Sequence, residues 1–218
     1  NDANLAGSLG KNIGEMVKAG FVVPDGFIVS SHAYFSFIKE NNLTHRIEHL
    51  LSTAHFERVD SLMQISQHIK KLILHGGMPE DFAKEAFFAY RKLSGLLGKS
   101  NLVIRSNMAV DNFSQTSLHE AYFNVKGEAN LLLKIKEAWA SFFEPGVMFN
   151  RHKKHLNHLR TGMAVVVQKM VKPEQSGVMF TMDPDTSDKS IIVVGGNKVK
   201  KHNLEIIKRA DMENKMLT

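Results

Sequence analysis

The stretch MAVVVQKMVKPEQSGVMFTMDP, residues 163–184, decides the fold of this chain. It begins with an apolar run that ends at Gln168 and Lys169, passes through a charged turn, and closes with a second apolar run. Apolar runs of this length, rich in β-branched residues and bounded by turn residues, predict β-strands, here over 163–171 and 177–182. Two interpretations are open: the runs form a plain β-hairpin of the core, or they form the floor of a ligand site.

The first part of the chain has the pattern of helices. A glycine-rich turn followed by apolar residues at helical spacing predicts a helix over 7–20. A Pro-Asp-Gly turn, a short strand at 27–29 and a helix over 33–39 come next. Apolar residues three and four positions apart then predict about three helices within 43–97.

The second part is richer in strands. A helix is expected over 127–145, stopped by Pro145, and another over 151–160 with its basic residues facing water. Helices followed by strands favour an α+β fold with an internal boundary, and we place two lobes at 1–166 and 167–218. The further strands are expected at 102–105, 121–125, 190–194 and 203–208.

Composition limits the class of protein. The chain has 218 residues, of which 43% are apolar and 23% charged, as in a folded domain with one sizeable core. It lacks both a membrane-spanning apolar stretch and a secretory signal, so we expect a cytoplasmic protein. The absence of cysteine excludes disulfides, thiol catalysis and cysteine-ligated zinc. The net charge of +6 attracts anions, nucleic acid among them.

Two features are candidates for anion binding. The turn Gly7-x-x-Gly10-Lys11 leads into a helix whose first N–H groups and lysine suit a phosphate, although an ordinary helix start has the same pattern. Arg105 ends an apolar strand, where a guanidinium needs an anionic partner. That partner is either a carboxylate of the protein or a ligand phosphate.

Together these stretches resemble the nucleotide-binding domain of the phosphoenolpyruvate synthase and pyruvate phosphate dikinase family, which includes rifampicin phosphotransferase. The resemblance covers most of the chain and rests on segments that occur in the same order as in the family. These segments are GKNIGEM at 10–16, VPDGF at 23–27, LVIRS at 102–106, FNVKGEANLLLKIKEAWASFFEP at 123–145, and the stretch 163–184.

The resemblance implies an ATP-grasp-like fold that holds ATP between two lobes. It also implies a phosphotransferase in which this domain passes a phosphoryl group to a histidine on a separate carrier domain, in cis or in trans. Neither that histidine domain nor the family's barrel domain has a counterpart in these residues. Arg105 corresponds to the family arginine that meets the phosphates and is the catalytic candidate. The other nucleotide contacts implied are Lys11, Val29, Gln168, Lys169, Met170 and Val171.

The chain departs from the family pattern at the phosphate and metal positions. The family lysine of the glycine-rich turn is replaced by Leu9, and Lys11 lies two residues further on. The Gly-Leu-Gly-Glu segment that holds magnesium in relatives has no counterpart, so the expected Mg²⁺ lacks its ligands. The carboxylates that could replace them also suit turns or the surface: Glu120, Asp183, Asp185 and Asp188.

Three hypotheses about function follow. The chain is the ATP-binding domain of a phosphoenolpyruvate synthase-like phosphotransferase, or it is a degenerate relative that acts as a non-catalytic nucleotide-binding or protein-interaction module. In the third, the basic runs 151–160 and 198–209 bind nucleic acid. We disfavour the third, because no aromatic residues are interleaved with those runs to stack on bases.

Overall fold

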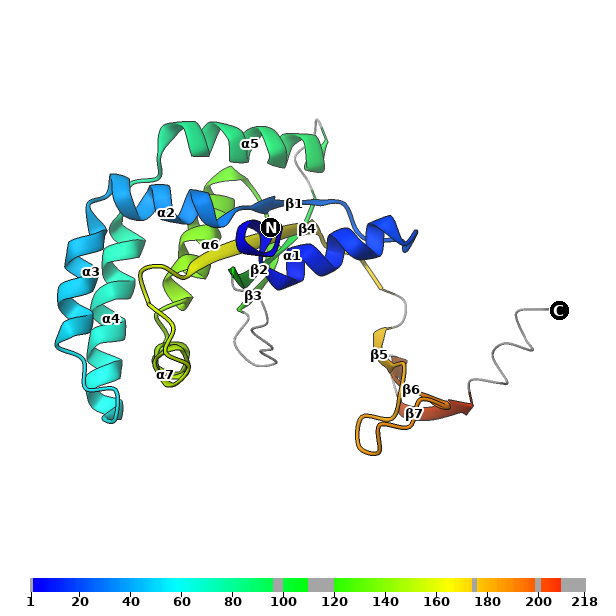
Figure 1. The fold of residues 1–218 in the computed structure, drawn as a ribbon. Helices are drawn as coiled ribbons and strands as arrows, with labels where there is room; N and C mark the ends of the chain where they lie inside the picture. The colour runs from blue at the N-terminus through cyan, green and yellow to red at the C-terminus, as the bar shows by residue number, and fades with distance from the viewer. Residues whose placement is uncertain (1, 96–99, 110–119, 174–175, 199–200, 209–218) are drawn as a thin grey trace. The chain divides into compact units, whose positions relative to one another are not determined.

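The structure, a computed structural model, describes residues 2–95, 100–109, 120–173, 176–198 and 201–208 (Figure 1). It divides into two compact units, Asn1–Met170 and Val171–Thr218. The described residues form helices and two antiparallel sheets, so the predicted α+β class is confirmed. Every helix in this part of the chain is too short or too polar to cross a bilayer.

The helices of the described residues all belong to the first unit. The three helices predicted within 43–97 are confirmed, and the second and third are separated where the glycines and proline of residues 76–79 interrupt the apolar pattern. Figure 1 shows α3 and α4, the first two of these helices, lying side by side. The helices are α1 (Asp2–Lys18), α2 (Ser31–Glu40), α3 (Leu43–Ser52), α4 (Val59–His75), α5 (Glu80–Ser94), α6 (Glu128–Ser141) and α7 (Pro145–Lys153).

Two predicted helix boundaries are wrong. Pro145 begins α7 instead of ending α6, because proline at the first helical position gives up an N–H that has no intrahelical acceptor anyway. The predicted helix over 151–160 ends at Lys153, and His155 has a left-handed backbone with φ 53°. Arg151 does not face water: it is 0% exposed.

A four-stranded antiparallel sheet forms the centre of the first unit. Its strand order is β1-β4-β2-β3, so β4 lies between β1 and β2. Helices α2 and α6 pack against one face, and α1 crosses the other, as Figure 1 shows. The strands are β1 (Gly26–Val29), β2 (Leu102–Ala109), β3 (Ala121–Val125) and β4 (Gly162–Lys169).

The two apolar runs of residues 163–184 do not form a hairpin. The first run is β4, which already has a neighbour on each side and therefore offers no free edge to the second run. The second run is β5 (Ser176–Phe180), which pairs with β6 (Ile191–Lys198) in a separate three-stranded sheet completed by β7 (Lys201–Lys208).

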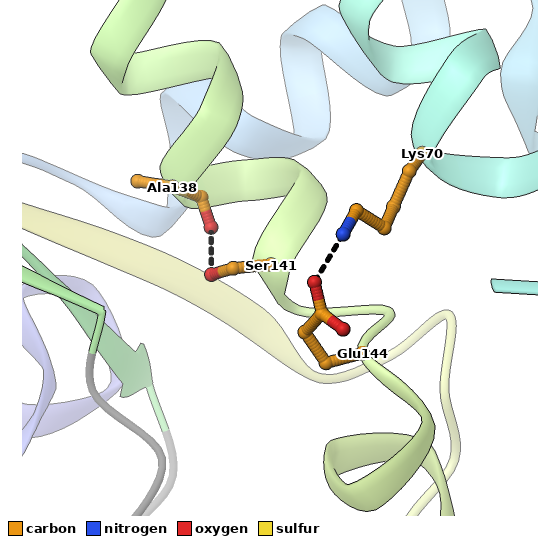
Figure 2. Close-up of polar contacts among 4 residues, drawn as sticks. All are labelled: Lys70, Ala138, Ser141 and Glu144. Atoms are coloured by element: carbon orange, nitrogen blue, oxygen red, sulfur yellow. Dashed lines mark hydrogen bonds and ion pairs between the residues drawn. The ribbon is translucent and has the colours of Figure 1, made fainter. Parts of the chain in front are cut away.

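The hydrophobic core lies between the sheet and helices α2 to α7. Polar contacts tie these helices together at their ends. Lys70 of α4 forms an ion pair with Glu144, which lies between α6 and α7 (Figure 2). Lys136 of α6 donates to the carbonyl oxygens of Leu74, at 2.9 Å, and Gly76, at 3.2 Å, and so caps the end of α4.

Candidate functional site

Arg105 and Gln168 lie on the same face of the sheet, although they are far apart in the sequence. In the antiparallel pairing of β2 with β4, Arg105 is opposite Val166 and Val103 is opposite Gln168. Directly opposed residues share a face, and so do residues two apart along a strand. Arg105 and Gln168 are therefore diagonal neighbours, on the face that α1 crosses.

Arg105 is partly buried in this face. Its strand neighbours are Val166 on β4 and Ala121 on β3. Among the residues that the structure describes, no carboxylate forms an ion pair with its guanidinium. Within the described residues, Arg105 therefore has no partner for a structural salt bridge.

Helix α1 contains a backbone break at the start of the glycine-rich turn. Gly7 has φ 70° and ψ 174°, which are not helical, and the helix resumes at Ser8. Beyond the break, Gly10, Ile13 and Val17 face the sheet. A Cβ on Gly10 would touch Ile28 of β1, and Ile13 and Val17 line a pocket together with β1. The spacing of these three positions is that of one helix face.

Lys11 lies on the solvent side of α1. Its Nζ is 4.0 Å from the Glu15 carboxylate one turn away, and both side chains are largely exposed. The structure does not bring Lys11 together with Arg105, and a contact of Lys11 with nucleotide stays a prediction.

The end of β4 is held by hydrogen bonds from its neighbours. Gln168 is 6% exposed, and its Nε2 donates to the Pro24 carbonyl at 3.1 Å. The Lys169 main-chain N–H donates to the Asp25 carbonyl at 2.8 Å, and its Nζ lies 3.3 Å from the Asp25 carboxylate. The Met170 N–H donates to the Asn101 carbonyl at 2.8 Å. The main-chain N–H groups of Lys169 and Met170 are therefore already paired within the protein.

The other two predicted contacts lie elsewhere. Val29 is opposite Val165 in the register of β1 and β4, and both belong to the hydrophobic core. Val29 thus lies on the sheet face opposite to Arg105 and Gln168, and the structure does not bring it to them. Val171 is exposed and begins the second unit. Nucleotide contacts of Val29 and Val171 stay predictions.

Two pockets flank the end of β4. The first, of about 420 Å³, lies on the α1 side and is lined by Ile13 and Val17 of α1, by β1 and the loop before it, and by Val166 and Gln168 of β4. The second, of about 560 Å³, lies beside Lys169, where α5 contributes Phe88. Only the first shares its face with Arg105. Its volume lies within the range of small-molecule sites.

The candidate metal carboxylates are turn residues where the structure describes their contacts. Asp183 accepts from the Asp185 N–H at 2.8 Å, and this bond lowers the pKa of the Asp183 carboxyl. Asp188 accepts from the Ser190 N–H at 2.8 Å, which likewise lowers its pKa. In the described ranges no three His, Asp or Glu side chains gather closely enough to hold a metal ion.

Sequence analysis missed Asn107, which lies on the same sheet face as Arg105. It is fully buried, and its amide contacts both sides of the break at Gly7. A signal was available: a polar residue two positions after Arg105 in an apolar strand must share the arginine's face. What it touches was not readable, because α1 lies about a hundred residues earlier in the chain.

Comparisons with known proteins match most of the chain. Residues 3–197 match the family described as pyruvate phosphate dikinase, AMP/ATP-binding domain. A probable phosphoenolpyruvate synthase of Methanocaldococcus jannaschii is 34% identical over 198 residues, covering 88% of this chain and 17% of that protein. The phosphoenolpyruvate synthase of Aeropyrum pernix is 37% identical over 196 residues, covering 87% and 24%.

A probable phosphoenolpyruvate synthase of Archaeoglobus fulgidus is 38% identical over 197 residues, covering 88% of this chain and 26% of that protein. The chain therefore spans between 17% and 26% of the length of these three relatives.

Proposed function

The chain belongs to the family of pyruvate phosphate dikinase AMP/ATP-binding domains, and from this premise we propose that it binds ATP on the α1 face of the four-stranded sheet. The observation that carries the proposal is the placement of Arg105 and Gln168 as diagonal neighbours on that face. The resemblance of the sequence assigns Arg105 to the phosphates and Gln168 to the base.

The base occupies the pocket beside Gln168. Adenine has apolar faces and a polar edge, which suits apolar walls with a few polar groups at one end. Val17 and Val166 supply such walls, and Gln168 supplies the polar end. The resemblance adds the main chain of Lys169 and Met170, which follow Gln168 directly, as further contacts to the edge of the base.

The phosphates extend from the base toward Arg105 and the break at Gly7. The pocket is lined by Val17 near the end of α1, whereas the helix resumes at Ser8 near its start. Exposed N–H groups and the helix dipole favour an anion at such a start. Arg105 adds a bidentate donor for phosphate oxygens. If ATP lies along α1, its phosphates meet the Arg105 guanidinium and the N–H groups of the helix start at Ser8.

In a longer protein, this domain would supply a phosphoryl group of ATP to a histidine of a carrier domain. The three relatives whose names state phosphoenolpyruvate synthase are more than three times as long as this chain, which supports a division of the reaction among domains. Because the described residues gather no cluster of three His, Asp or Glu side chains, we derive no step of transfer through a metal ion.

A second function is a nucleotide-binding module without transfer. The observation behind it is that no cluster of three His, Asp or Glu side chains gathers within the described ranges. Magnesium separates the two functions. A chain that transfers phosphoryl groups should bind ATP more tightly with Mg²⁺, whereas a binding module should bind ATP equally well without it.

Calorimetric titration with ATP, with and without Mg²⁺, tests the proposal. GTP serves as the control for base specificity. Arg105→Ala should weaken ATP binding by roughly 10- to 100-fold, because a hydrogen bond to a charged group contributes about 1.5–3 kcal/mol. Arg46→Ala is the matched control, since Arg46 is exposed on α3.

The pocket has its own pair of variants. Val17→Trp should fill the pocket beside Gln168 and weaken ATP binding, and Phe88→Ala should alter only the pocket beside Lys169. If Arg105→Ala and Val17→Trp bind ATP as the parent does, the assignment of this face is wrong.

A further inference from the structure

Asn107 is a buried polar side chain to which the proposed ATP contacts assign no role. It is 0% exposed and follows Arg105 by two positions on the same face of β2. Its Nδ2 donates to the Ala6 carbonyl at 3.1 Å, and its Oδ1 accepts from the Ser8 hydroxyl at 3.3 Å. One amide therefore holds the residues on both sides of Gly7.

The backbone of Gly7 and the Asn107 amide fit each other. With φ 70° and ψ 174°, Gly7 occupies a region that residues with a side chain rarely adopt. A Cβ on Gly7 would lie 2.0 Å from Asn107 Nδ2, well inside any allowed contact. The space left by the missing side chain is filled by the amide that bridges the break.

The short segment before the break has an anchor of its own. Ser31 at the start of α2 is buried, and its hydroxyl donates to the Asn4 carbonyl at 2.7 Å. Asn107 then connects that anchored segment, through Gly7, to the longer segment Ser8–Lys18. The direction of the longer segment relative to β2 is therefore set at this amide.

We propose that Asn107 is a positioning residue of the nucleotide site, which fixes the start of Ser8–Lys18 relative to Arg105 so that both meet the same phosphates. The inference rests on the proposed function. The bridge needs one donor and one acceptor on a short side chain, which asparagine supplies. Aspartate lacks the donor, and serine is too short to reach Ala6 and Ser8 together.

The test compares ATP with AMP in calorimetric titrations of the chain and its Asn107→Ser variant. The dissociation constant for ATP should rise about tenfold, since the variant loses two hydrogen bonds that orient the phosphate end. The dissociation constant for AMP should change less than twofold, because AMP lacks the terminal phosphates that reach the start of the helix. A role limited to stability would shift both nucleotides alike.

Asn41→Ser is the matched control. Asn41 also bridges backbone groups: it donates to the carbonyls of Phe37 and Gly77 and accepts from the Gly77 N–H, away from the α1 face. This variant should lower the unfolding midpoint and leave the preference for ATP over AMP unchanged. Asn107→Ala removes the same amide without adding a charge, and it gives the same comparison of ATP with AMP if Asn107→Ser unfolds.

The outcomes separate the inference from the proposed function. If the parent binds ATP and the Asn107 variants lose ATP and AMP affinity equally, or lose neither, the inference alone is overturned. If the parent binds no ATP, the proposed function fails and the inference fails with it. Selective loss of ATP affinity in the Asn107 variants, without such loss in Asn41→Ser, supports both.

Discussion

Arg151→Met should leave the first unit as stable as the parent or stabilise it, although it removes a buried arginine. Arg151 is 0% exposed, and its guanidinium carbon lies 3.6 Å from the centroid of the Phe142 ring. Its Nη2 donates to the Phe142 carbonyl at 2.5 Å. Within the described part of the chain, its Nε and Nη1 have no partner.

The magnitude follows from opposing contributions. Burial lowers the pKa of Arg151 to about 9, and at about 1.4 kcal/mol per tenfold change in protonation the charge costs the folded state about 5 kcal/mol at neutral pH. The bond to Phe142 returns about 1.5–3 kcal/mol, and the cation–π contact returns about 2 kcal/mol where water is excluded. The sum leaves Arg151 unfavourable by about 0 to 1.5 kcal/mol.

Methionine fills a similar volume without a charge, so the expected change in unfolding free energy is between about 0 and +2 kcal/mol. Urea denaturation at pH 7 measures it, with an unchanged slope as the sign that the folded state is retained. Arg151→Lys is the control: its ammonium cannot stack as a plane on Phe142 and is more strongly hydrated, so it should destabilise. A loss of 3 kcal/mol or more in Arg151→Met would refute the reasoning, since losses of about that size accompany the breaking of a paired buried charge.

Three further predictions concern stability. Burial, with smaller contributions from neighbouring cations, lowers the pKa of His158 to about 4. Below pH 6.5 the unfolded chain binds the proton first, so the unfolding free energy should fall by about 2–3 kcal/mol toward pH 4. Urea denaturation at pH 7 and pH 5 measures this fall, and His158→Gln should abolish the contribution of His158 to it. Lys70→Met and Glu144→Gln should show a coupling of about 0.5–1 kcal/mol in a double-mutant cycle that weakens in 1 M salt, and additive effects would contradict the ion pair. Gly7→Ala should lower the unfolding free energy by about 2–3 kcal/mol or more, because of backbone strain and overlap with Asn107. Gly14→Ala, whose Cβ meets nothing within 4 Å, should raise the unfolding free energy by about 0.5–1 kcal/mol. Equal thermal midpoints for these two variants would show that the break at Gly7 is not required.

Local patterns predicted much of the first unit. The helical periodicity within 43–97 and the turn residues at 76–79 indicated α3, α4 and α5, because apolar spacing and helix-breaking residues act over a few positions. The strand at 27–29 and the strand that carries Arg105 were also predicted. Boundaries were less certain where one residue suits two roles, as Pro145 does at a helix end and at a helix start.

The candidate site was only half readable. The resemblance pointed to Arg105 and Gln168, but it also grouped Val29 with them, and the register of β1 with β4 places Val29 on the opposite face. A strand pattern reports that residues alternate between two faces and does not report which neighbouring strand each face shares. The bridge from Asn107 to Ala6 and Ser8 could not be predicted, since it joins segments about a hundred residues apart.

By itself the sequence determined the α+β class, the order of the helices and strands, and the family, because these depend on local periodicity and on motifs kept in order. Only the tertiary structure decided that β4 pairs with β1 and β2 and not with β5, that Arg151 is buried, and that Arg105, Asn107 and Gln168 share one face. The physical reason is that hydrophobic burial is non-directional: it requires each apolar run to find partners, and only long-range strand pairing and helix packing choose which partners those are.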